Sequence, residues 1–200
     1  MKVVILAGGF GTRLAEETKI RPKPLVKIGG KPIIWHIIKI YNHYGIKEFV
    51  ICLGYKGDLL KKELDKLNKK KIWDIKYVHT GKKTMTGGRI KRIKNYVNND
   101  EYFCLSYGDG LSDVNINKLV KFHIKNNKIA TLTAVRYKNP KGVLSINKKS
   151  FSERPVSNSG SCPLMIERAA FTVLLKWSCL KFPVKRATSN FSDSIKSLNG

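Results

Sequence analysis

The chain has 200 residues, enough for one domain with a substantial core, or for one and a half. Hydrophobic residues make up 42% of the chain and charged residues 26%, and no long apolar run is present. This composition argues against an intrinsically disordered chain and against a membrane-spanning protein as the main interpretation. Lys and Arg number 39 against 14 Asp and Glu, which gives a formal net charge of +25.

Such a positive excess raises a nucleic-acid hypothesis, because Lys and Arg that neutralise phosphates dominate non-specific affinity for DNA and RNA. The distribution of the lysines argues against it. They are scattered over the expected helices and loops, with no zinc-finger spacing, aromatic RNA-binding pattern or basic arm. We expect a solvated Lys-rich surface that favours anionic substrates, and a nucleic-acid-binding module is the alternative.

The start of the chain and its cysteines bear on the compartment. The apolar run Val3–Ala7 stops at two glycines, too early for the core of a signal peptide, so we expect a cytoplasmic protein. No cysteine forms a C-x-x-C pair or stands near a His at ligand spacing, which favours reduced structural thiols over a disulfide or zinc. The four cysteines are Cys52, Cys104, Cys162 and Cys179.

Strand and helix patterns alternate along the first two thirds of the chain. In chain order, the pattern predicts a strand at Lys2–Leu6, a helix from Pro32 to Tyr41, a strand at Glu48–Leu53 and a helix over Leu59–Leu67. It continues with a strand at Ile75–Val78, a helix at Arg89–Val97, a strand at Tyr102–Ser106, a helix at Ile116–Ile124 and a strand at Ala130–Val135.

This alternation indicates an α/β fold, an open and mostly parallel sheet with helices on both faces. Ligands of such sheets bind outside the carboxyl ends of the strands. Glycine-rich turns follow two of the expected strands, after Leu6 and after Ser106. Both turns are therefore expected at the same edge of the sheet, which predicts a binding site there.

The last quarter of the chain differs in composition. Residues 151–200 hold 9 Ser and 2 Ile, whereas residues 1–150 hold 4 Ser and 18 Ile. The apolar patches Phe171–Leu175 and Trp177–Phe182 lack convincing caps or turns. We therefore expect two parts, a nucleotide-binding domain over residues 1–155 and a tail of uncertain structure over residues 156–200.

Two short motifs carry chemistry. Leu6–Leu14 reads L-A-G-G-F-G-T-R-L, in which backbone N–H groups can approach a phosphate chain or a base edge, and Arg13 adds a forked cation. It is neither a Walker A loop nor a Rossmann G-x-G-x-x-G. Lys23 follows between Pro22 and Pro24, which we expect to hold it in an extended, stiff backbone that loses little freedom on meeting a phosphate.

The motif L-A-G-G-x-G-T-R-L followed by P-K-P-L resembles the amino-terminal signature of the sugar-nucleotide pyrophosphorylases. Lys31–Ile34 and Tyr107–Gly110 continue that pattern in order. Within this family, Thr84–Arg89 resembles the M-T-G-G-R segment of the glucose-1-phosphate cytidylyltransferases, and Ile34–Ile37 and Gly54–Gly57 match that branch too. The thymidylyl and uridylyl branches carry different residues here, which favours CTP as donor.

The resemblance implies a three-layer Rossmann-like nucleotidyltransferase that transfers a cytidylyl group from CTP to glucose 1-phosphate, with CDP-glucose and pyrophosphate as products. Attack by a sugar-phosphate oxygen on the α-phosphorus is implied, with Mg²⁺ as cofactor. Such transfers need positioning and charge neutralisation more than a covalent nucleophile. The family also implies a homo-oligomer, a role in nucleotide-sugar and O-antigen or lipopolysaccharide biosynthesis, and no membrane partner.

The residues carried over by the resemblance fall into three groups. Catalytic roles are implied for Arg13, which would hold the triphosphate, for Lys23, which would neutralise phosphate charge, and for Asp109, which would bind Mg²⁺. The nucleotide would be lined by Leu6, Ala7, Gly8, Gly9, Gly11, Thr12, Thr84, Gly87, Gly88 and Arg89. The sugar phosphate would meet Glu153 and Arg154, in a turn similar to the family's F-x-E-K-P.

The chain departs from the family pattern in two places. The stretch Lys61–His79 is shorter than in the family, which has an additional arm there. After Pro155 we find neither the N-G-G-F-F-V strand nor the later W-x-x-x-D segment, whose Asp would be a second metal ligand. We interpret residues 156–200 as divergent or frameshifted, with the sugar-binding half truncated. The alternatives are a degenerate nucleotide-binding relative with little activity, or another nucleoside triphosphate as donor.

The four histidines are expected to be packed or hydrogen-bonded rather than catalytic. They are His36, His43, His79 and His123. His36 lies beside Trp35 on an apolar helix, and we expect Trp35, Ile37 and Ile38 to belong to the core.

Overall fold

The computed structural model describes residues 1–9, 21–133 and 172–176, and the backbone of 143–146 and 151–154. The described strands of the main sheet are β1 (Val3–Leu6), β4 (Glu48–Leu53), β5 (Asp74–His79), β6 (Tyr102–Tyr107), β7 (Ala130–Leu132) and β10 (Thr172–Lys176). The described helices are η1 (Lys23–Leu25), α2 (Ile33–His43), α3 (Gly57–Leu67), α4 (Thr86–Arg92), α5 (Lys94–Val97) and α6 (Ile116–Asn126). Two small antiparallel pairs accompany them, β2 (Lys27–Ile28) with β3 (Lys31–Pro32), and β8 (Val143–Ile146) with β9 (Phe151–Arg154).

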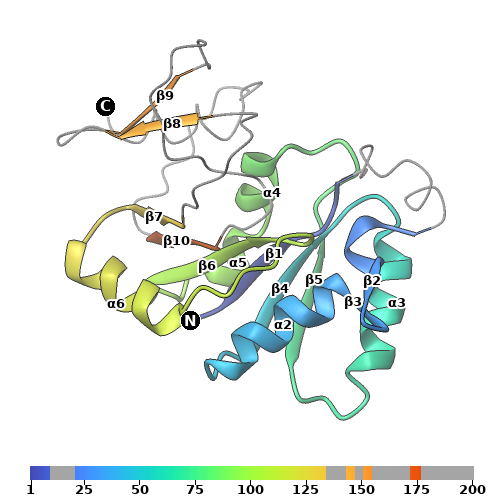
Figure 1. Ribbon diagram of the computed structural model, residues 1–200. Coiled ribbons are helices and arrows are strands. Elements are labelled where there is room, and N and C mark those ends of the chain that lie inside the picture. Colours follow the sequence, from blue (N-terminus) through green and yellow to red (C-terminus); the bar gives the residue numbers. More distant parts are fainter. Residues whose placement is uncertain (10–20, 134–142, 147–150, 155–171, 177–200) are drawn as a thin grey trace.

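The sheet is mostly parallel and mixed, as the alternation of the patterns predicts. Its strand order is β5-β4-β1-β6-β10-β7. The first four strands pair in parallel, and β10 pairs antiparallel with both β6 and β7. Figure 1 shows β1 near the middle of the fan of strands.

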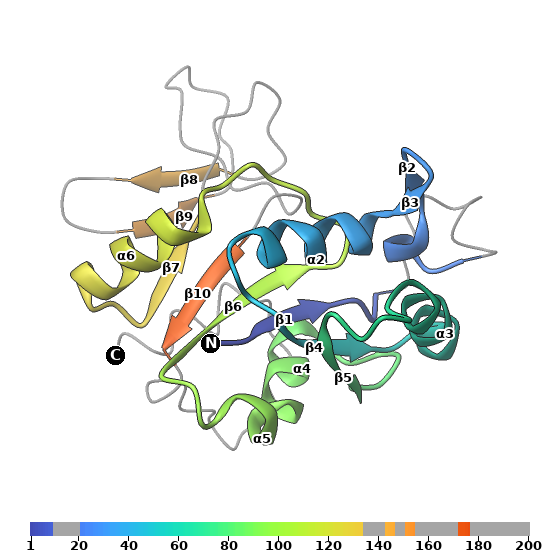
Figure 2. The same ribbon diagram turned by 90° about the horizontal axis from the view of Figure 1, so that it is seen from below.

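Helices cover both faces of the sheet, which makes three layers. Figure 2 shows α2 and α6 on one side of the sheet and α4 and α5 on the other. Alternate residues of β1 supply the two cores: Val3 and Ile5 pack with α2, α3 and α6, whereas Val4 and Leu6 pack with α4 and α5. All four residues of the strand are buried, which explains the unbroken apolar run in the sequence.

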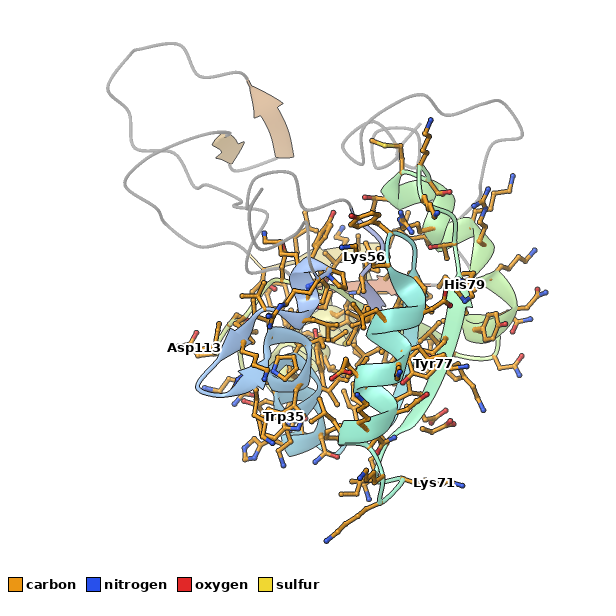
Figure 3. The ribbon with its side chains drawn as sticks, turned by 90° about the vertical axis from the view of Figure 1, so that its right-hand side faces the viewer. Trp35, Lys56, Lys71, Tyr77, His79 and Asp113 are labelled. Carbon is orange, nitrogen blue, oxygen red and sulfur yellow. The ribbon has the colours of Figure 1, made fainter. Side chains whose placement is uncertain are left out.

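Helix α2 follows the apolar spacing seen in the sequence. Pro32 caps it in an extended conformation, and the buried side chains Ile37 and Ile38 are those expected in the core. The expectation that Trp35 belongs to the core is wrong, because this residue is only partly buried at the edge of the core. Its ring, labelled in Figure 3, lies 5.9 Å from the ammonium groups of Lys31 and Lys39. A ring flanked by two cations remains partly in contact with water.

The predicted helix Arg89–Val97 is split in two. Ile93 separates α4 from α5. The backbone hydrogen bonds there span three residues instead of four, from Ile93 N–H to the Ile90 oxygen and from Tyr96 N–H to the Ile93 oxygen. Ile93 and Val97 are both fully buried. The break turns both side chains onto the sheet, and this tertiary packing outweighs the helical periodicity.

Strand β10 lies inside the stretch that the composition marks as a tail of uncertain structure. It inserts between β6 and β7, and its residues Val173, Leu174 and Leu175 are at most 2% exposed. The Tyr41 hydroxyl lies 2.7 Å from the Thr172 hydroxyl, which ties β10 to α2. This segment is therefore part of the sheet. Its five residues, with an apolar centre, are too few to change the Ser and Ile content of the last fifty residues. The patch Trp177–Phe182 lies outside the described residues.

Two of the cysteines are buried free thiols on the strands that flank β1. Cys52 of β4 and Cys104 of β6 are fully buried, and burial raises the pKa of each thiol to about 12. Thiols of this kind are inert structural groups. Cys162 and Cys179 lie outside the described residues. Within the described residues no helix is long and apolar enough to cross a membrane.

His123 is a buried, hydrogen-bonded histidine, as expected. Its Nδ1 lies 2.8 Å from the Thr131 hydroxyl of β7. Burial lowers its pKa below the ordinary 6.5, the charge of Lys176 acts in the same direction, and Glu101 opposes them. The fold therefore favours the neutral imidazole.

The lowered pKa of His123 makes the protein less stable in acid. As pH falls below 6.5, the unfolded chain takes up the proton first, so stability present above 6.5 is lost down to the folded pKa. We expect the free energy of unfolding by urea to fall more between pH 7.5 and pH 5.5 in the native protein than in His123→Gln. Equal losses in the two proteins would contradict this assignment.

Candidate active site

The carboxyl ends of β1, β4, β5 and β6 meet at one edge, because these four strands are parallel. Gly8 follows β1, Gly54 follows β4, Thr80 follows β5, and Gly108 follows β6. Backbone hydrogen bonds join these ends, from Gly108 N–H to the Leu6 oxygen at 3.0 Å and from Ala7 N–H to the Cys52 oxygen at 3.1 Å. The two glycine-rich turns thus share the edge at which the sequence predicts a site.

Lys23 and Asp109 form an ion pair at this edge. The Lys23 ammonium donates to Asp109 Oδ2, and the two side chains are 30% and 27% exposed. Lys23 opens η1 instead of an extended segment, since only Pro22 before it is extended. Proline is compatible with the first turn of a helix, so the two prolines stiffen a turn. The structure brings together a cation and a carboxylate that are 86 residues apart in the chain.

Gly108 allows this pair to form. A Cβ at position 108 would lie 2.9 Å from Pro24 Cγ and 3.2 Å from the Leu6 oxygen. Any larger residue would push η1 away from β6, and Lys23 away from Asp109. The glycine beside the carboxylate therefore has a packing role.

Arg89 is buried beneath the Gly8 turn. One guanidinium nitrogen, Nη1, donates to the Leu53 oxygen at 3.2 Å and to the Thr80 hydroxyl at 2.6 Å. The other, Nη2, donates to the Gly8 oxygen at 2.9 Å and to the Lys82 oxygen at 3.4 Å. The resemblance implies that Arg89 contacts the nucleotide. In the structure its hydrogen bonds go to protein oxygens, with 5% of the residue exposed.

The segment before and within α4 is held by a second arginine. Arg92 Nη1 donates to the Thr84 hydroxyl at 2.7 Å and to the Thr80 oxygen. Gly87 and Gly88 lie in the first turn of α4, and a Cβ at Gly88 would lie 2.8 Å from Thr84 Cγ2. The predicted set Thr84, Gly87 and Gly88 therefore forms one compact turn. Thr80 and Arg92 are participants that no motif in the sequence singles out.

Only some of the remaining predicted site residues lie within the part of the chain that the structure describes. Leu6 and Ala7 have buried side chains, so only their backbone is open to a ligand. Gly9 is exposed at the turn. Gly11, Thr12 and Arg13 lie outside the described residues. Glu153 and Arg154 belong to β9, whose backbone alone is described.

Asp109 has the donor chemistry that Mg²⁺ prefers, because a carboxylate oxygen is a hard ligand. Within the described part of the chain, no group of three or more His, Cys, Asp or Glu side chains lies together. Mg²⁺ commonly takes one or two carboxylates and completes its shell with substrate phosphates and water. Asp109 therefore fits a metal held jointly by the protein and a nucleotide.

The fold is a three-layer one, a mostly parallel sheet between two layers of helices. A glycine turn, a lysine and a carboxylate lie at the carboxyl edge of its strands. This arrangement is typical of Rossmann-like proteins that bind phosphate-bearing substrates. The family model described as "Nucleotidyl transferase" matches residues 2–171. The chain belongs to this family.

The relatives narrow the family further. The chain is 44% identical to the glucose-1-phosphate cytidylyltransferase of Salmonella typhimurium, over 78% of this chain and 69% of that protein. It is 41% identical to the probable glucose-1-phosphate cytidylyltransferase of Bacillus subtilis, over 79% of this chain and 70% of that protein. A putative glucose-1-phosphate thymidylyltransferase from Bacillus anthracis, solved in complex with a sucrose, has the same fold, with a TM-score of 0.79, 20% identity, and coverage of 100% of this chain and 82% of that one.

Proposed function

We propose that this chain transfers a cytidylyl group from CTP to glucose 1-phosphate, with CDP-glucose and pyrophosphate as products. The observation that carries the proposal is the place of Thr84–Arg89 in the structure. This segment, which resembles the cytidylyltransferase branch, sits beside the Gly8 turn and is joined to it by Arg89. The relatives at 44% and 41% identity support the same donor and acceptor.

Lys23 neutralises phosphate charge in this proposal. In the structure its ammonium is paired with Asp109 and remains accessible at 30% exposure. A bound triphosphate offers the ammonium several anionic oxygens, so Lys23 exchanges a carboxylate for phosphate. The exchange keeps the lysine charged and leaves the Asp109 carboxylate facing the phosphates.

Asp109 holds Mg²⁺ in this proposal, and the metal, when bound, supplies further neutralisation of phosphate charge. An oxygen of the sugar phosphate forms a new bond to the α-phosphorus of CTP. The bond from that phosphorus to the bridging oxygen breaks, and pyrophosphate leaves with the electron pair. The protein contributes orientation and positive charge, and no side chain is needed as a covalent nucleophile.

The glycine turn and the segments outside the described residues complete the proposed site. Gly8, Gly9, Gly11 and Thr12 line the nucleotide, Arg13 holds its triphosphate, and Thr84, Gly87 and Gly88 border it. Glu153 and Arg154 meet the sugar phosphate. These roles follow from the resemblance of the motifs, and the position of Gly8 beside Arg89 and Thr80 supports a binding surface there.

We place the activity in nucleotide-sugar biosynthesis for surface polysaccharides such as O-antigen or lipopolysaccharide. The cytoplasm is the proposed compartment, because it is where CTP is made. A homo-oligomer is the proposed assembly. The biosynthetic role and the homo-oligomer follow from the resemblance to the cytidylyltransferase branch.

Pyrophosphate release with Mg²⁺ and glucose 1-phosphate tests the donor. CTP, dTTP, UTP, GTP and ATP are compared, with Asp109→Ala as the blank. Release with CTP alone, lost in the variant, is the expected result. Release with another nucleotide would make the donor wrong. No release with any nucleotide, while CTP still raises the melting temperature, would favour the degenerate nucleotide-binding relative.

A further inference from the structure

One buried side chain ties together the carboxyl ends of three neighbouring strands. The Arg89 guanidinium reaches Gly8 after β1, the Leu53 oxygen at the end of β4, and Thr80 after β5. The Thr80 hydroxyl itself donates to the Leu53 oxygen at 2.8 Å, so it donates one hydrogen bond and accepts another from Arg89. Arg89 is therefore placed to fix the relative positions of these three ends.

Two glycines make room for this side chain. A Cβ at Gly8 would overlap the Arg89 guanidinium. A Cβ at Gly54 would lie 2.5 Å from the Gly8 oxygen, 2.8 Å from Gly8 Cα and 2.9 Å from Arg89 Nη1. Two of these three neighbours are backbone atoms, which cannot swing away as the end of a flexible side chain does. Gly54 is thus required for the Gly8 carbonyl to meet the guanidinium.

The direction of the Gly8 carbonyl decides the direction of the next amide. The Gly8 oxygen points inward, since it accepts from Arg89 Nη2 at 2.9 Å and from Tyr55 N–H at 3.4 Å. No cis peptide bond occurs among the described residues, so the Gly9 N–H points opposite to that carbonyl. Gly9 is exposed, and a Cβ placed on it would meet nothing within 4 Å. Its N–H therefore faces the open side of the turn.

The Arg89 guanidinium also places a positive charge beneath the Gly8 turn. Within the described residues no carboxylate lies within ion-pair distance of Arg89, and its acceptors are carbonyls and a hydroxyl. A buried cation whose acceptors among the described residues are carbonyls and a hydroxyl contributes positive potential to its surroundings. The open side of the Gly8 turn lies next to this positive potential and suits an anionic ligand.

We propose that Arg89 is a positioning residue, which holds the Gly8 carbonyl inward so that the Gly9 N–H donates to the nucleotide, and that Gly54 is required for this contact. The inference rests on the proposed function in one respect, that the glycine turn meets the nucleotide. It assigns to Arg89 an action through the backbone, and it gives Gly54 a role in nucleotide binding.

A double-mutant cycle on CTP binding tests the proposal. Arg89→Lys keeps the charge but not the fork, and Gly54→Ala pushes on the Gly8 carbonyl without changing the arginine. Each is expected to weaken CTP binding, measured by calorimetry, by about tenfold or more, the size for misplacing one donor to a charged acceptor. The double variant is expected to bind no more weakly than the weaker single variant. Lys91→Ala, on the exposed face of α4, is the control and is expected to bind as the native protein does.

Titration of the native protein followed by the amide resonance of Gly9 adds a test that needs no variant. CTP is expected to shift the Gly9 amide and to leave that of Gly45, which lies between α2 and β4 at the opposite edge, unchanged. Additive losses in the cycle, or an unmoved Gly9 amide in a protein that binds CTP, would overturn the positioning role. Unchanged affinity in both single variants would overturn it as well. A native protein that does not bind CTP at all would overturn the proposed function and this inference together.

Discussion

Replacing Lys23 by Met is expected to lower kcat/KM for cytidylyl transfer by about 10²–10³-fold, the range for removing one group that stabilises transition-state charge. The reason is the place of the ammonium, at the carboxyl edge of the sheet and in contact with Asp109. Thermal stability is expected to change little, because a partly exposed ion pair contributes only about 0–1 kcal/mol. The measurement is steady-state pyrophosphate release alongside the melting temperature.

Lys71→Met is the matched control for Lys23→Met. Figure 3 shows Lys71 at the end of the molecule opposite to His79, before β5 begins and far from the carboxyl edge. The control removes the same charge and is expected to keep the native rate. Equal rates in both variants would mean that Lys23 is only a solvated lysine. A parallel loss of melting temperature and activity in Lys23→Met would mean that the ion pair is structural.

Replacing Leu174 by Ala is expected to lower the free energy of unfolding by about 2–5 kcal/mol, the range for truncating a buried leucine. Leu174 is fully buried on β10, in the same core as Ile5 and Ile37. The strand holds this position between β6 and β7 although it lies in the compositionally different last quarter of the chain. Urea unfolding monitored by circular dichroism measures the loss.

Leu59→Ala is the control for Leu174→Ala, because Leu59 on α3 is 37% exposed. It is expected to cost less than about 1 kcal/mol, since little apolar surface leaves the core. A shortened chain that ends at residue 155 is expected not to fold, because it lacks the strand between β6 and β7. Native stability in Leu174→Ala and in the shortened chain would show that residues 1–155 form the whole domain.

Much of the fold was predictable because local pattern and tertiary packing agree. The apolar run at β1 and the spacing of Ile33, Ile34, Ile37 and Ile38 each match a fully buried strand or helix face. The antiparallel strand β10 has only three apolar residues, Val173–Leu175, and no turn signals, so its sequence resembles any short buried segment. The hairpin of β2 and β3 does have a sequence signal, the pair Gly29-Gly30, whose φ angles of 55° and 79° suit a two-residue turn.

The sequence predicts at which edge of the sheet the candidate site lies, but not which side chains contact one another there. Parallel topology alone places Gly8 and Asp109 at the same end of the sheet. The pairing of Lys23 with Asp109 depends on how η1 packs on Gly108, which no local pattern reports. Arg89 was found through its motif, but its buried course under Gly8 follows from the placement of α4 against the sheet. Thr80 has no sequence signal at all.

Tracing the phosphorus atoms of CTP shows which bond of the nucleotide this chain breaks. The purified chain is incubated with Mg²⁺, glucose 1-phosphate and CTP that carries radiophosphorus at the α or at the γ position. The α label is expected in CDP-glucose and the γ label in pyrophosphate, with both transfers lost in Lys23→Met. Label released from the γ position as inorganic phosphate, or an α label that never joins the sugar, would contradict cytidylyl transfer by this chain.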